Sequence, residues 1–208
     1  MIRSTREAGF TLIEMMISVV ILLLAMAGLA SLLIQNSRIN KAEQMTVEVQ
    51  GNARNTLSMV VQKLRSAGWD PNNMGIPTLR LDGAIPGSST ADTISEIEIF
   101  ADLDEVIVGT VADATTGDGE QVLVRHVSNQ VIWRTTNDPN DPFVVVSDNI
   151  SNDANGDGTI EPMFVPDSIT APTVVTVQIT AQSPVIDPVT QDFIRYTVSS
   201  DVVLRKDL

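Results

Sequence analysis

The sequence predicts an α+β protein in which one long N-terminal helix, first transmembrane and then a stalk, packs on a head built from an antiparallel β-sheet. Two observations carry this prediction. A long apolar segment near the N-terminus continues into a segment with helical spacing of apolar residues, and the remaining chain contains short runs in which apolar and polar residues alternate. Periods of about 3.6 and 2 residues are typical of amphipathic helices and half-buried strands, respectively.

The apolar segment is long enough to cross a membrane. Residues 19–34 contain no charged residue, and the segment extends back to Phe10, which gives 25 residues. A helix needs roughly 20 apolar residues to span a hydrocarbon core of about 30 Å. Arg3 and Arg6 precede the segment. The positive-inside rule therefore predicts a single-pass membrane protein with a cytoplasmic N-terminus and a head in the periplasm or outside the cell.

Two simpler interpretations explain less of this segment. A secretory signal peptide is cut after its apolar region at a small-residue site, and no such site follows Ile34 directly. A plain membrane anchor accounts for the length of the segment but not for Glu14. A carboxylate near the start of an apolar helix is costly, which makes Glu14 a candidate functional residue.

The stretch AGFTLIEMMISVVILLLA, which includes Gly9, Phe10 and Glu14, resembles the type IV prepilin signature. The resemblance implies that a prepilin peptidase cuts after Gly9, removes residues 1–9 as a leader and methylates the new N-terminal Phe10. The resemblance also implies that Glu14, the fifth mature residue, meets the Phe10 amine of a neighbouring subunit and sets the register between subunits.

The charges of Phe10 and Glu14 fit such a pairing. In apolar surroundings an ammonium and a carboxylate each cost several kcal/mol alone, and they stabilise each other when paired. The alternative is a Glu14 side chain that extends to the edge of the membrane, which its position near the helix start allows.

Residues 35–67 form the predicted stalk, an amphipathic continuation of the helix. Lys63 and Arg65 lie in its last turn, where cations interact favourably with the helix dipole, and Gly68 follows as a stop signal. A helix over residues 10–67 is about 87 Å long, and we expect its lower half to lay one apolar stripe on the head. The stripe contains Ile39, Ala42, Thr46, Val49, Ala53, Leu57, Val60 and Leu64.

Residues 68–208 form the predicted head. Ser128 and Asn129 form a hairpin-like turn between two strand-like runs, and residues 71–93 are expected to be a long loop. Seven runs have the composition of strands. These runs are 95–101, 105–112, 121–127, 130–136, 142–146, 173–181 and 192–205.

The head is strongly acidic. Residues 66–208 contain 22 Asp and Glu residues against six Lys and Arg residues, within a chain of net charge −13. This balance argues against a nucleic-acid-binding surface, because contacts with phosphates need clustered Lys and Arg. The chain has no Cys. We therefore expect core packing, rather than disulfide bonds, to hold the head together.

Residues 153–158, DANGDG, fit D-x-[DN]-x-[DN]-G, the first half of an EF-hand-type calcium loop. Oxygen ligands at alternate positions of such a loop converge on one ion. The full loop has a bidentate Glu where this chain has Phe164, so the alternative is a solvated acidic turn. No other cofactor is expected. The candidate ligands are Asp153, Asn155, Asp157, the Thr159 carbonyl and Glu161.

The sequence does not predict an enzyme. His126 is the single His and lies in a strand-like run, which favours a surface or core residue over a catalytic one. The chain has no Cys nucleophile and no G-x-S-x-G elbow. It also lacks a Gly-rich phosphate loop after a strand.

Three further stretches resemble PilW-type minor pilins and the related J-type pseudopilins of type II secretion: RSAGWDPNN at 65–73, residues 125–134 and the final DVVLRKDL. The resemblance implies a structural minor pilin that joins or primes a type IV pilus. Its partners would be other minor and major pilins, prepilin peptidase and the inner membrane, and its final location the surface pilus. The alternatives are a J-type pseudopilin in a periplasmic pseudopilus, or a membrane-anchored protein that binds an extracytoplasmic ligand.

Overall fold

The structure is a computed structural model that describes residues 11–69, 78–81, 95–101, 121–135, 141–168 and 172–204. These residues form one helix, α1 (Leu12–Arg65), and two antiparallel sheets. The first sheet has the strand order β1-β2-β3-β4-β5 and the second has the order β6-β7-β8. The strands are β1 (Leu79–Leu81), β2 (Glu96–Phe100), β3 (Gln121–Val127), β4 (Gln130–Arg134), β5 (Val144–Asp148), β6 (Phe164–Pro166), β7 (Val174–Gln182) and β8 (Arg195–Val203).

Helix α1 has 54 residues and is therefore about 81 Å long. Thr11 caps its start, because the Thr11 side-chain oxygen accepts a hydrogen bond from the Glu14 backbone N–H. The helix ends at Arg65, slightly before the predicted end. The chain turns there, and Gly68 adopts a φ of 73°, which favours glycine. The Gly68 N–H donates to the Phe100 carbonyl on β2 at 2.9 Å and so ties the turn to the first sheet.

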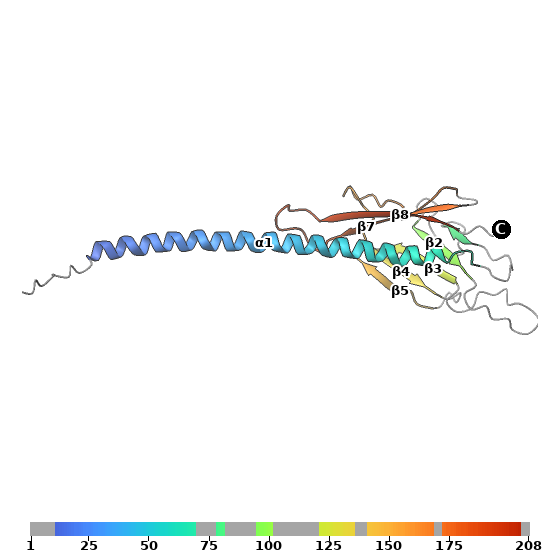
Figure 1. Ribbon diagram of the computed structural model, residues 1–208, viewed down its shortest axis with the longest axis horizontal. Coiled ribbons are helices and arrows are strands. Elements are labelled where there is room, and N and C mark those ends of the chain that lie inside the picture. The colour runs from blue at the N-terminus through green and yellow to red at the C-terminus, as the bar shows by residue number, and fades with distance from the viewer. Residues whose placement is uncertain are drawn as a thin grey trace, which may run out of the picture.

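The C-terminal half of α1 packs on the head, whereas most of its N-terminal half stands clear (Figure 1). The packed half contacts β5, β7 and β8. The predicted stripe is confirmed over this half, but Ile39, Ala42 and Thr46 are exposed or only partly buried, because they face the connection between β7 and β8 rather than a sheet. The buried positions of α1 are Val49, Ala53, Thr56, Val60, Val61 and Leu64.

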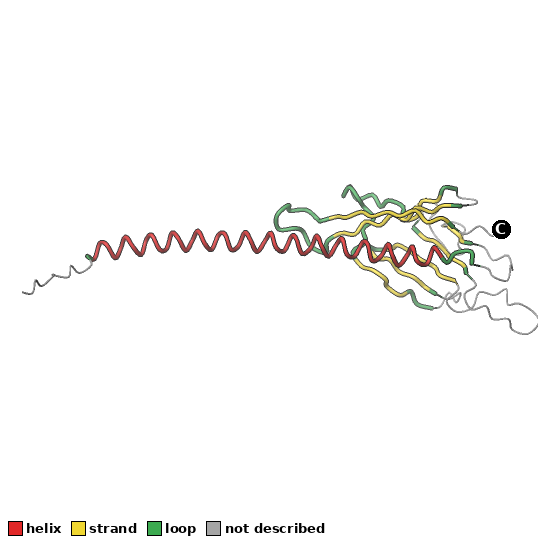
Figure 2. The backbone as a smooth tube through the Cα atoms, viewed as in Figure 1, coloured by secondary structure: helices red, strands yellow, loops and turns green. Residues whose placement is uncertain are grey.

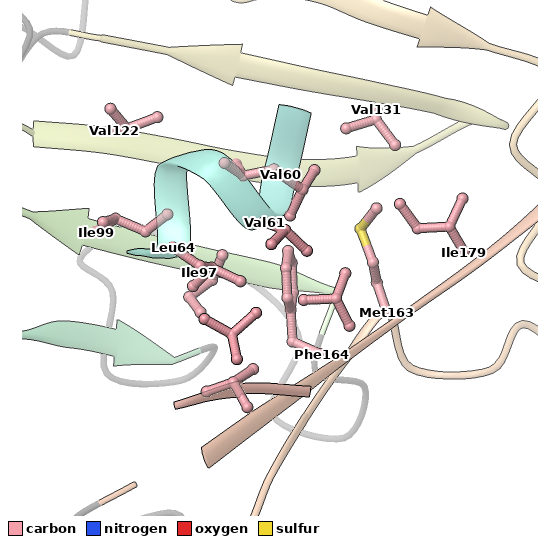
Figure 3. Packing of buried hydrophobic residues seen from close by; sticks show 14 of the residues in the cluster. Val60, Val61, Leu64, Ile97, Ile99, Val122, Val131, Met163, Phe164 and Ile179 are labelled. Carbon is pink, nitrogen blue, oxygen red and sulfur yellow. The ribbon is translucent and has the colours of Figure 1, made fainter. Parts of the chain in front are cut away.

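One hydrophobic core joins the helix to both sheets. Side chains from α1, from the first sheet and from β6 and β7 point toward one another in Figure 3. Phe164, Leu64 and Ile97 are among the largest fully buried side chains. Burial of one such side chain stabilises a fold by about 1.5–3 kcal/mol. Contacts of this kind connect the stalk rigidly to the head.

Six of the seven predicted strands are confirmed with small shifts at their ends, and the run at 105–112 lies outside the described residues. The predicted loop at 71–93 is wrong at Leu79–Leu81, where β1 pairs with β2, and β6 was not predicted. Both missed strands are three residues long, which is too short to show alternation. Pairing with a longer neighbour makes them strands, for example between Phe164 and Val177.

The predicted turn at Ser128 and Asn129 is confirmed. Both residues have positive φ angles, 51° and 62°, as a two-residue type I′ hairpin turn requires. The turn sets Val127 opposite Gln130 and so fixes the register of β3 and β4. The whole arrangement, a long helix against antiparallel sheets, is an α+β fold with pilin-like architecture.

Candidate functional site

The bare half of α1 is the most unusual surface of the described chain. Every residue from Thr11 to Lys41 is exposed. Large apolar side chains cover all sides of the segment, from Leu12, 80% exposed, to Ile34, 56% exposed. A helix that is apolar on every side is normally covered by protein or lipid. By length and composition, α1 is the one helix among the described residues that could cross a membrane.

Glu14 is the single charged residue between Thr11 and Ser37, and it lies in the first turn of α1. Its backbone is held on both sides: Thr11 Oγ1 accepts from the Glu14 N–H at 3.3 Å, and Ser18 Oγ donates to the Glu14 carbonyl at 2.7 Å. The residue itself is exposed. A carboxylate also interacts favourably with the positive end of the helix dipole at this position. Gly9 and Phe10, the predicted cleavage and methylation positions, lie outside the described residues.

Comparison with known proteins supports the interpretation of this segment. The family described as the prokaryotic N-terminal methylation motif matches residues 4–30. The chain carries a prepilin-like N-terminal methylation motif. The motif supports a type IV pilin-like or pseudopilin-like protein, and it indicates a structural pilin family. It implies processing by prepilin peptidase and assembly with other pilin subunits, and together with the apolar helix it fits a single-pass inner-membrane anchor.

The match ends at residue 30, within the bare half of α1, and leaves the head uncovered. We find no significant match to a curated protein or to a solved structure. What distinguishes this subunit from others with the same motif must therefore be sought in the head.

The predicted calcium ligands lie in one exposed loop whose oxygens bind the backbone of the loop itself. Asp153 accepts from the Gly156 N–H at 2.7 Å and from the Gly158 N–H at 3.1 Å. Asn155 Oδ1 accepts from the Asp157 N–H at 3.0 Å. These bonds curl the loop into the tight form that the glycines allow.

The second part of the loop continues this pattern. Asp157 Oδ1 accepts from the Thr159 N–H at 2.7 Å, and this bond is the main cause that lowers the pKa of Asp157 below its ordinary value. Glu161 Oε2 accepts from the Ala154 N–H at 3.0 Å. Among the described residues, no group of three or more His, Cys, Asp or Glu side chains is arranged to hold a metal ion. Calcium binding by this loop stays a prediction.

Arg195 of β8 lies directly against the loop. A Cβ atom placed on Gly156 would approach the Arg195 guanidinium to 2.8 Å. The same guanidinium lies 3.5 Å from the Asp192 carboxylate. Arg195 therefore places a positive charge against an acidic loop, which offsets part of the negative charge that would attract a cation.

His126 has a structural environment. Its ring is buried, and Nε2 donates to the Ile150 carbonyl at 2.7 Å. Burial lowers the pKa of His126, with a smaller opposing effect from that hydrogen bond. The bond from the imidazole to the Ile150 carbonyl joins β3 to the chain after β5, as expected of a core residue.

Sequence reasoning missed one feature of the head. The connection between β7 and β8 exposes an apolar tip, which we define as Val185, Ile186, Pro188 and Val189. The run PVIDPV at 184–189 is the sequence signal. Its short length and its two prolines make it look like an ordinary loop. Only the fold places it beside the bare half of α1.

Proposed function

We propose that the chain is a structural minor pilin of a type IV pilus, which primes assembly and is incorporated in the filament or at its tip. Cleavage between Gly9 and Phe10 and N-methylation of Phe10 would precede incorporation. One observation carries the proposal: an exposed carboxylate, Glu14, lies in the first turn of a bare apolar helix, within the stretch that matches the methylation motif.

The apolar helix needs cover in two successive environments. In the membrane, lipid covers the side chains of residues 12–34; in a filament, the helices of other subunits would replace the lipid. The same apolar surface serves both states, so transfer between them costs little apolar exposure. Because the rest of the segment is uncharged, Glu14 is the group that fixes how far the helix is shifted along the filament axis relative to its neighbours.

The proposed partner of Glu14 is the cationic amine of Phe10 on a neighbouring subunit. Removal of one member of a buried ion pair typically costs about 3–5 kcal/mol, because the other charge stays buried and unpaired. The pairing therefore acts as a register signal: a subunit that enters the filament at another height leaves both charges without a partner.

The substitution Glu14→Gln tests this role. We expect membrane insertion to persist, because the apolar segment is unchanged, and co-purification of the chain with its pilin partners to fall at least tenfold. Glu43→Gln is the matched control, since Glu43 is an exposed acid on the same helix beyond the apolar segment. Equal incorporation of the Glu14 variant and the wild-type chain would rule out the pairing.

The second candidate is a J-type minor pseudopilin of a type II secretion system. The methylation motif and the bare helix support it equally, because a pseudopilus is built from the same kind of subunit. The partners separate the two proposals. Crosslinking of the full chain to pilus subunits supports the pilin, whereas crosslinking to secretion pseudopilins, with a secretion defect on deletion, supports the alternative.

A further inference from the structure

The tip is an unusual patch for a loop of an acidic head. Val185, Ile186 and Val189 are 56%, 52% and 54% exposed, respectively. Three aliphatic side chains exposed within five residues form a local apolar surface, and grouped exposure of this kind marks a contact site more often than scattered exposure does. Nothing in the described chain covers these side chains.

Asp187, between the exposed apolar residues of the tip, forms several hydrogen bonds within the connection. The buried Asp187 carboxylate accepts from the Val189 N–H at 2.9 Å, from the Thr190 N–H at 3.1 Å and from the Thr190 hydroxyl at 2.7 Å. The Asp187 N–H donates to the Asp192 carbonyl at 2.9 Å, and the Gln191 N–H donates to the Asp187 carbonyl at 3.0 Å.

Two prolines, Pro184 and Pro188, remove further N–H donors from the same stretch. The hydrogen bonds of Asp187 therefore tie residues 187–192 of the connection together. Backbone groups paired in this way lower the cost of entering surroundings poor in water, where an unpaired polar group costs several kcal/mol.

The tip lies at the height where the apolar helix segment ends. Pro188 and Val189 line one groove together with Ser31, Ile34 and Arg38 of α1. Figures 1 and 2 show the connection between β7 and β8 as the part of the head that reaches furthest along the bare helix. Ile34 is the last residue of the uncharged apolar run at 19–34. If that run spans a bilayer, the tip is level with the membrane surface.

The charges near the tip fit a phospholipid surface. Arg38 and Lys41 are the first cations after the apolar run, and both are exposed. Arg38 lines the groove with Pro188 and Val189 nearest the apolar run, whereas the first acid, Glu43, lines a second groove with Val189, further along the helix from that run. Basic residues beside an apolar patch are typical of segments that bind at an anionic membrane surface.

We propose that the tip inserts into the interfacial region of the bilayer, with Arg38 and Lys41 on anionic phospholipid headgroups, and holds the head against the membrane before assembly. This inference rests on the proposed membrane-anchored pilin function. The contact would give the head a defined height and orientation over the bilayer. Extraction of the subunit into the filament would start from that position.

Single-cysteine labelling of the full chain tests the inference, because the chain has no Cys of its own. Val189→Cys carries an environment-sensitive fluorophore in phosphatidylethanolamine–phosphatidylglycerol vesicles that contain a lipid-bound quencher. Val203→Cys is the matched control, since Val203 is a 74% exposed valine at the other end of β8. Leu24→Cys, within the apolar run, reports insertion of the helix itself.

We expect quenching and a blue shift at positions 189 and 24 and neither at position 203. Replacement of phosphatidylglycerol by phosphatidylcholine should reduce the response at 189 and leave that at 24 unchanged. Equal signals at 189 and 203, with quenching at 24, overturn the inference and leave the anchor intact. No quenching at 24 overturns both. A fluorescence response at position 189 can also disappear as lipid is added at a fixed protein concentration. That result identifies a second copy of this chain as the partner of the tip and also overturns the inference.

Discussion

Gly156 and Gly158 both adopt positive φ angles, 78° and 86°, but they differ in their surroundings. A Cβ at Gly158 meets nothing within 4 Å, whereas one at Gly156 meets the Arg195 guanidinium at 2.8 Å. The pair therefore separates the cost of backbone conformation from the cost of displacing Arg195. An L-residue in the left-handed region costs about 1–2 kcal/mol.

We predict that Gly158→Ala lowers the free energy of unfolding by about 1–2 kcal/mol and that Gly156→Ala lowers it by more. The extra loss arises because Arg195 must leave its position beside Asp192. Denaturant unfolding of the full chain in detergent measures both values. Equal losses would mean that the guanidinium moves aside without cost.

The calcium prediction also belongs to single residues. Carboxylate and amide oxygens that accept one N–H bond retain a second lone pair for a cation. If the loop binds calcium, the melting temperature of the full chain should be higher in calcium than in chelator, with a stabilisation of about 2.7 kcal/mol at one hundred times the dissociation constant. Magnesium should substitute poorly, because it keeps its waters.

Asp157→Ala should abolish that calcium effect, and Asp141→Ala, at an exposed acid outside the loop, should not. A melting temperature that is the same in calcium and in chelator leaves residues 153–158 as an acidic turn stabilised by its own hydrogen bonds.

At the scale of elements, the helix and sheets are joined by a few side chains of α1. Leu64 is fully buried in the shared core, whereas Leu29, on the same helix, is 61% exposed and lies outside that core. We predict that Leu64→Ala lowers the free energy of unfolding of the head by about 2–5 kcal/mol. Leu29→Ala should leave it unchanged. Thermal unfolding in detergent, followed by the strand signal in circular dichroism, compares the two; a similar loss in both variants contradicts the assignment of Leu64 to the core.

Long elements could be predicted from the sequence because their patterns repeat over many residues. The stripe on α1 was predicted at Val49, Ala53, Val60 and Leu64, and all four are buried. By contrast, β1 and β6 span three residues each and become strands only by pairing with β2 and β7. Their partners are distant in sequence, so local patterns carry no signal for them.

For the candidate site, too, features made of consecutive residues could be predicted and features made by the fold could not. The N-terminal motif is local, so Glu14 and its neighbours could be identified from consecutive residues. The tip could not, since its meaning depends on Val189 lying beside Ser31 and Ile34, which are more than one hundred residues away in the chain. The fold creates that proximity through the antiparallel pairing of β7 and β8 and their packing on α1.

At the scale of the whole molecule, the processing prediction decides which chain enters the filament. We expect mass spectrometry of the mature protein to show loss of residues 1–9 and a methylated Phe10 at the N-terminus. Cells without prepilin peptidase provide the control and should retain the leader. Assembled material that still begins at Met1 would refute the prepilin interpretation.

One continuous helix, α1, belongs both to the apolar anchor and to the core of the head, and it runs through Gly28 and Gly51 without interruption. The molecule is therefore a long, continuous helix whose C-terminal end is packed into the core of the head. A pull on the head along the axis of α1 loads the contacts from Val49 to Leu64 in shear, so they resist together rather than peeling one at a time. Because α1 has no break, no hinge within it can absorb a displacement of the head along the helix axis. A force on the head along α1 is therefore transmitted directly to the apolar segment of the same helix.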